Sequence, residues 1–116
     1  MSKDSKETKI EVTVSLNEEK IPVGISWEAE DGSNKGPTDC KAMMLAFFDK
    51  STKETQKIDL WTKEMQVVEM DRFFFQTLRS MADTYYKATQ NAQLASDMQR
   101  FVQYFGEQTE IIPKNS

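Results

Sequence analysis

The chain has 116 residues, of which 29% are charged and 38% are hydrophobic, and its formal net charge is −4. This composition is typical of one folded domain rather than of a disordered chain or of two domains. The mildly acidic balance argues against nucleic-acid binding, because phosphates require a concentrated basic face. The sequence has no run of 18 apolar residues, so no membrane span is predicted.

Residues 1–8 are polar and charged, and we expect them to form a flexible N-terminal tail. This end of the chain lacks the apolar core of a signal peptide, so we expect a cytoplasmic protein. Cys40 is the only cysteine. An internal disulfide is therefore impossible, which fits a reducing compartment.

Strict alternation of apolar and polar residues predicts strands at residues 9–16 and 21–29. Their apolar faces carry Ile10, Val12, Val14 and Leu16 in the first and Val23, Ile25 and Trp27 in the second. The polar residues 17–20 form a turn between them. Residues 31–38, rich in Gly, Asn, Ser and Pro, are expected to be a loop.

Residues 41–49, KAMMLAFFD, have no polar face, and their composition favours a helix by propensity. The segment is nevertheless short and bounded by turn signals, and a second strand-like segment follows at residues 55–63. We therefore predict that residues 41–49 are a strand.

Two helices are predicted, at residues 67–88 and 92–105, because apolar residues recur at three- and four-residue spacing. The predicted stripes are Val67, Met70, Phe74, Leu78, Met81 and Tyr85, then Leu94, Met98, Phe101, Val102 and Phe105. Asn91 or Thr89 is expected to cap the second helix, and Gly106 to end it. Residues 107–116 are expected to form a C-terminal tail.

Strands first and helices last predict an α+β class. We expect residues 9–106 to be a single domain. Its fold would be a four-stranded antiparallel meander sheet with both C-terminal helices packed on one face.

The sequence predicts no catalytic residue, metal site or cofactor. It contains no histidine, the commonest general base and metal ligand. Cys40 has no histidine to activate it, and one cysteine cannot form a zinc site. The spacing of the clustered carboxylates matches no calcium-binding loop, and we interpret them as solvent-exposed surface groups.

The outer face of the sheet is the predicted interaction site. An even-length loop centred on Thr52 and Lys53 would turn Leu45 and Leu60 toward the helices, opposite each other. The other face would then carry the candidate partner-binding residues Met44, Phe48, Asp59 and Trp61, with Met44 opposite Trp61. A one-residue slip would exchange the faces. There are two interpretations of these apolar groups. Long side chains such as Lys57 cover them, or the apolar groups form a contact surface for another protein or subunit.

The segment IDLWTKEM at residues 58–65, followed by EM, FF, QTL and SMADT, resembles the GldC family. The resemblance extends through ISWEAEDG, CKAMMLAFFD and QNAQLASDMQRFVQYF, which is nearly the whole chain without its tails. Gln66 departs from the family pattern, which favours proline there. Proline is well tolerated in the first turn of a helix.

The resemblance implies a non-catalytic accessory protein of bacterial gliding motility and the linked type IX secretion system. It would act by binding a protein of that machinery, and a homo-oligomer through the open sheet face is a further expectation. The alternative is a small-ligand carrier or minimal enzyme, with a cavity between sheet and helices lined by Trp27 and by Met and Phe side chains. An enclosed cavity with converging polar groups would favour the alternative.

Overall fold

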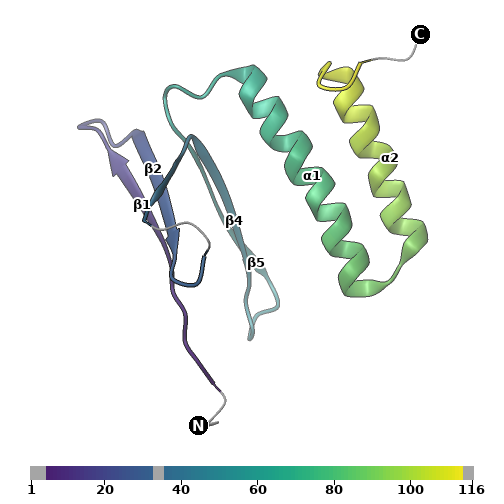
Figure 1. Ribbon diagram of the computed structural model, residues 1–116, viewed down its shortest axis with the longest axis horizontal. Coiled ribbons are helices and arrows are strands. Elements are labelled where there is room, and N and C mark those ends of the chain that lie inside the picture. The colour runs from purple at the N-terminus through teal and green to yellow at the C-terminus, as the bar shows by residue number, and fades with distance from the viewer. Residues whose placement is uncertain (1–4, 33–35, 114–116) are drawn as a thin grey trace. The chain divides into compact units, whose positions relative to one another are not determined.

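The computed structural model describes residues 5–32 and 36–113 (Figure 1). Its elements in chain order are β1 Ile10–Leu16, β2 Pro22–Ala29, β3 Thr38–Cys40, β4 Ala42–Phe48, β5 Thr55–Trp61, α1 Val67–Thr89 and α2 Ala92–Gln108. This order confirms the α+β class. The chain divides into two compact units, residues 1–65 with the strands and residues 66–116 with the helices.

Each unit is described by itself below. The predictions of a single domain over residues 9–106, of terminal tails, and of helices covering one sheet face stay predictions. Residues 1–4 of the predicted N-terminal tail and 33–35 of the predicted loop lie outside the described residues.

The predicted four-stranded meander is wrong, because the strands form a three-stranded sheet, β1-β2-β3, and a two-stranded sheet, β4-β5. Residues 38–40 pair with β2, so that Ile25 lies opposite Cys40. After Lys41 the chain changes partner, and β4 pairs with β5. Because of this switch, β2 and β4 are not neighbours among the described strands. Three residues are too few to show alternation. The predicted loop had included Thr38, and residues 39–40 had been assigned to no element.

The alternation predicted for β1 and β2 is confirmed. Val12 lies opposite Trp27 and Val14 opposite Ile25, so their side chains share one face of the three-stranded sheet. Ile25 is buried, with 3% of its surface exposed. The opposite face is polar and places Glu11 directly opposite Glu28.

The strand predicted at residues 41–49 is confirmed, but its register differs by two residues from the prediction. Met44 lies opposite Asp59 rather than Trp61, and Leu45 lies opposite Ile58 rather than Leu60. Side chains alternate with a period of two along a strand. A two-residue shift therefore keeps together the side chains that were predicted to share a face.

The turn between β4 and β5 explains this register. The carboxylate of Asp49 accepts hydrogen bonds from the backbone N–H groups of Ser51 and Thr52, at 2.9 and 2.8 Å. The backbone N–H of Asp49 donates to the carbonyl of Glu54 at 2.8 Å. An Asx turn of this kind fixes the loop one residue earlier than predicted.

The two helices form a hairpin, and their ends follow from local capping. The side chain of Asn91 accepts a hydrogen bond from the backbone N–H of Leu94 at 3.0 Å, as a helix N-cap should. Gln66 is the N-cap of α1, and its backbone N–H donates to Oε1 of Glu69 at 3.0 Å. A proline at position 66 would lack this donor.

Gly106 does not end α2, which continues to Gln108. The residue is buried where a side chain would not fit. A Cβ there would lie 2.7 Å from Cε1 of Phe75 and 2.6 Å from Cδ1 of Ile112. Glycine is therefore a packing residue at this position rather than a helix terminator.

The buried residues of the helix unit are Phe75, Ala82, Ala95, Val102 and Gly106. Five predicted stripe residues are instead substantially exposed: Val67 (79%), Phe74 (40%), Met81 (52%), Leu94 (45%) and Phe101 (52%). Each of the last four is followed directly by a buried residue. Val102 is the one predicted stripe residue among the buried ones. Small residues at the contact let the two helices approach closely, so most of the large residues in the predicted stripe lie beside the contact rather than in it.

Candidate interaction surfaces

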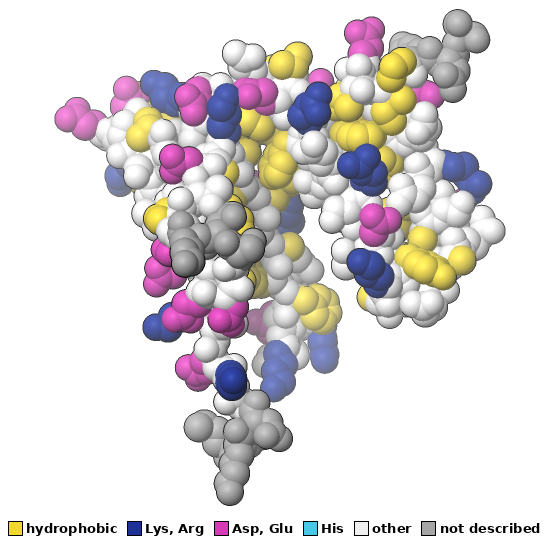
Figure 2. Space-filling view, in the orientation of Figure 1, with side chains coloured by type: hydrophobic (Ala, Val, Ile, Leu, Met, Phe, Trp, Pro, Cys, Tyr) yellow, Lys and Arg dark blue, Asp and Glu magenta, His cyan; other side chains and the backbone are white. Residues whose placement is uncertain are grey.

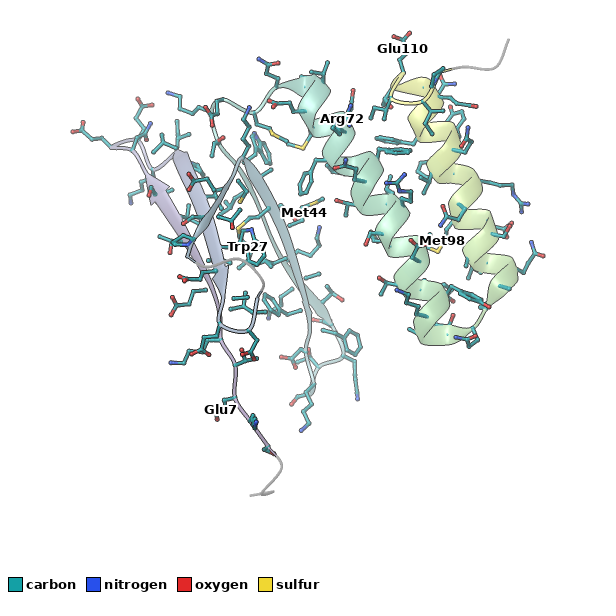
Figure 3. The ribbon with its side chains drawn as sticks, in the orientation of Figure 1. Glu7, Trp27, Met44, Arg72, Met98 and Glu110 are labelled. Atoms are coloured by element: carbon teal, nitrogen blue, oxygen red, sulfur yellow. The ribbon has the colours of Figure 1, made fainter. Side chains whose placement is uncertain are left out.

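The four residues of the predicted patch, Met44, Phe48, Asp59 and Trp61, lie on one face of the β4-β5 sheet. Met44 and Asp59 are directly opposite each other, and directly opposed residues point to the same side. Phe48 and Trp61 follow at even spacing along their strands, so they share that side. Trp61 lies opposite Ala42. Met44 is labelled on β4 in Figure 3.

Two aromatic side chains of this patch are open to solvent. Phe48 is 68% exposed and Trp61 is 55% exposed, whereas Met44 is half-buried. Nζ of Lys57 lies 3.0 Å from Oδ1 of Asp59 on the same face. This exposed ion pair contributes little stability. The pair lies between Trp61 and Phe48 along the sheet, because Asp59 is opposite Met44 and Lys57 is opposite Ala46.

The other face of the same sheet is also apolar, as the sequence predicted. Ile58 is 48% exposed and Phe47 is 58% exposed, while Met43, Leu45 and Leu60 are half-buried. Figure 2 shows apolar side chains at the surface of both units, interspersed with charged ones. Exposed large apolar groups on neighbouring strand positions are typical of contact surfaces.

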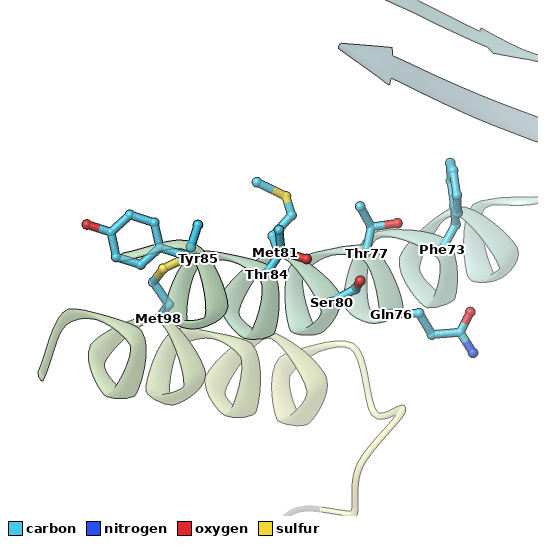
Figure 4. Close-up of a pocket in the computed structure, with 9 residues that line it drawn as sticks. Phe73, Gln76, Thr77, Ser80, Met81, Thr84, Tyr85 and Met98 are labelled. Carbon is cyan, nitrogen blue, oxygen red and sulfur yellow. The ribbon is translucent and has the colours of Figure 1, made fainter. Parts of the chain in front are cut away.

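A second surface, which sequence reasoning missed, is a groove of about 640 Å³ on the helix unit (Figure 4). Nine described residues line it, and none of them is charged: Phe73, Gln76, Thr77, Ser80, Met81, Thr84, Tyr85, Ala88 and Met98. Eight come from α1. Met98 comes from α2 and lies beside Tyr85 at one end (Figure 4). The open groove is suited to an apolar protein surface rather than to a charged ligand.

The sequence did contain a signal for this groove. Two rows of α1 residues, each spaced by four, form its sides: Phe73, Thr77, Met81 and Tyr85 in one, and Gln76, Ser80, Thr84 and Ala88 in the other. Residues four apart lie along one ridge of a helix. Met81 and Tyr85 had been interpreted as core residues, and the neighbouring Thr77, Ser80 and Thr84 had been given no role.

Cys40 and the carboxylates are the described side chains from which metal binding or nucleophilic chemistry would have to come. Within residues 5–32 and 36–113, no group of three or more His, Cys, Asp or Glu side chains could hold a metal ion. Burial raises the pKa of the Cys40 thiol, with a smaller contribution from Asp39 in the same direction. A raised pKa keeps the sulfur protonated and therefore a weak nucleophile.

In the part of the chain that the structure describes, neither helix has the length and hydrophobicity needed to span a bilayer. The molecule is thus a small α+β protein with apolar groups exposed on both of its units.

The family model for gliding motility-associated protein GldC-like matches residues 22–111, well over half of the chain. The chain belongs to this family, and the resemblance seen in the sequence is confirmed. Neither the search of curated proteins nor the search of solved structures finds a match to it.

Proposed function

We propose that this protein is a non-catalytic accessory protein of bacterial gliding motility and the linked type IX secretion system. It acts in the cytoplasm by binding another protein of that machinery. Membership of the GldC-like family supports the link to motility. The observation that carries the binding role is the exposure of Phe48 and Trp61 on the sheet face that they share with Met44.

The chemistry of this patch fits a protein partner. Aromatic residues and methionine are enriched in the centres of protein interfaces, and tryptophan is a frequent hot spot. The Lys57–Asp59 ion pair lies among these apolar groups, between Trp61 and Phe48 along the sheet. Charged groups of an interface mainly set orientation and association rate rather than affinity.

A second copy of the chain bound through this face is the alternative occupant. A ligand carrier or minimal enzyme, using a cavity between sheet and helices, is the second alternative. The groove on α1 is not such a site, because it is open rather than enclosed.

The test compares Trp61→Ala with Ile58→Ala, because both residues lie on β5 but point to opposite faces. Their side chains are similarly exposed, at 55% and 48%. Tagged variants would be used to recover the partner from the native bacterium, beside thermal unfolding of each purified variant. We expect Trp61→Ala to weaken binding by about 2 kcal/mol or more, which is about 30-fold. Ile58→Ala should bind as wild type does.

An equal loss of partner for both variants would remove the assignment to one face. A large drop in unfolding temperature for Trp61→Ala, with no selective loss of binding, would make Trp61 a core residue. If the purified chain associates with itself as its concentration rises, and recovers no other protein, the second copy is the occupant of this face.

A further inference from the structure

We propose that the groove on α1 binds α1 of a second copy of this chain, in a parallel two-fold dimer. The groove shares no residue with the Met44, Phe48, Asp59 and Trp61 patch. The dimer would therefore be a property separate from partner binding, and each can fail without the other.

Most of the groove lies on the side of α1 that α2 does not cover. The α1 residues buried in the helix unit are Phe75 and Ala82. Ser80 and Thr84 each lie two residues from Ala82, which is about 200° around the helix axis. Of the nine described lining residues only Met98 comes from α2, at the end beside Tyr85.

The groove has the shape that a packed helix requires. Its two sides are rows of residues spaced by four, and such rows are the ridges that interdigitate when helices pack. A row of this kind on one helix fits beside the groove of another. The groove runs from Phe73 to Ala88, a helix length of about 22 Å at a rise of about 1.5 Å per residue. It therefore suits a helix rather than a small molecule.

The lining of the groove is complementary to itself. One row is mostly large, with Phe73, Met81 and Tyr85, and the other is mostly small, with Ser80, Thr84 and Ala88. A two-fold axis along the groove exchanges the two rows between copies. The large row of each copy then lies against the small row of the other, and Met81 of each copy comes next to the other's Ser80. A symmetric interface requires such self-complementarity.

Charge supports the same occupant. In a two-fold dimer, each charged group near the axis lies close to the same group of the other copy, so a charged surface would repel itself. The nine described lining residues carry none, although 29% of the chain is charged. The threonine and serine hydroxyls can bond to the backbone of their own helix, so their burial in a dimer leaves no unpaired group.

The experiment uses the full chain and exchanges the sizes of two neighbouring groove residues. Ser80→Met places large against large, and Met81→Ser places small against small. The double variant Ser80→Met/Met81→Ser moves the large residue to the other row and restores the match. Phe101→Ser is the control, because Phe101 lies outside the groove and is 52% exposed, as Met81 is.

The readout is the dimer dissociation constant from sedimentation equilibrium, with thermal unfolding measured in parallel. We expect each single variant to weaken dimerisation about tenfold or more, and the double variant to recover to within about threefold of wild type. Phe101→Ser should leave the constant unchanged. This pattern would establish the groove as the dimer interface.

Three results would overturn the proposal. Wild type that stays monomeric up to about 1 mM has no specific dimer. A dimer that none of the groove variants weakens uses another surface. Single variants that lower the unfolding temperature of a monomer, without rescue in the double variant, would mean that the groove is filled by another part of the same chain.

Discussion

Substitution of Gly106 tests the packing of the helix unit, because two effects oppose each other at this position. In an exposed helix interior, glycine to alanine stabilises by about 1 kcal/mol. Here the new Cβ would lie 2.7 Å from Cε1 of Phe75 and 2.6 Å from Cδ1 of Ile112. Forcing an extra methyl into a packed core costs about 1–3 kcal/mol.

The surroundings of Gly106 decide which effect is larger. Phe75 is only 6% exposed, so its ring has little room to turn away. Ile112 lies beyond the end of α2, and the tip of its side chain can move. We therefore expect the steric cost to exceed the gain in helix propensity, and Gly106→Ala to destabilise the protein by roughly 1 kcal/mol net.

Urea titration measures this difference as a change in midpoint at constant m value. The same substitution in an Ile112→Ala background should cost less, because one of the two clashing groups is gone. Such non-additivity is expected for residues in direct contact. A stabilisation of about 1 kcal/mol by Gly106→Ala would refute the reasoning, because the value would be that of an exposed helix position.

Three further predictions concern the strand unit. Thr62→Val should be neutral or stabilise by up to about 1 kcal/mol in urea titration, because Thr62 is 2% exposed and its hydroxyl has no hydrogen-bond partner among the described residues. Glu28→Lys should stabilise by about 0.2–1 kcal/mol at low salt, and less at high salt, because it replaces a like-charge pair with Glu11 by an attractive one. Hydrogen bonds from the backbone of Thr52 and Ser51 lower the pKa of Asp49 from 3.8. The stability from this carboxylate is therefore complete above pH 3.8 and is lost as pH falls through the lowered pKa. Acid titration of the unfolding temperature should show this loss in wild type and not in Asp49→Asn.

Local patterns predicted much of this fold. Alternation located β1 and β2, and shortness with flanking turns identified β4 despite its helical composition. The parity of the β4-β5 turn placed Met44 and Trp61 on one face, although the turn itself lies one residue earlier. The grouping of side chains by face was predicted correctly, because it depends only on odd or even position along each strand. The pairing register was not, because it also depends on the Asx turn of Asp49.

The features that the sequence did not reveal depend on small residues or on very short pairings. The strand at residues 38–40 is defined by its pairing with β2, and three residues carry no periodic pattern. The helix contact is marked by Ala82, Ala95 and Gly106, which contribute little to a stripe of large apolar residues. Phe101 stood out in that stripe, and the structure leaves it 52% exposed.

The partner switch at Lys41 also bears on how the chain folds. It leaves each described strand paired only with a strand next to it in sequence, β1 with β2, β2 with β3 and β4 with β5. The helices likewise form a hairpin of sequence neighbours. Short loops cost little entropy to close, and proteins dominated by such local pairings fold within about milliseconds or faster. Each hairpin can therefore form as soon as its own residues have been synthesised, without waiting for a distant strand to arrive.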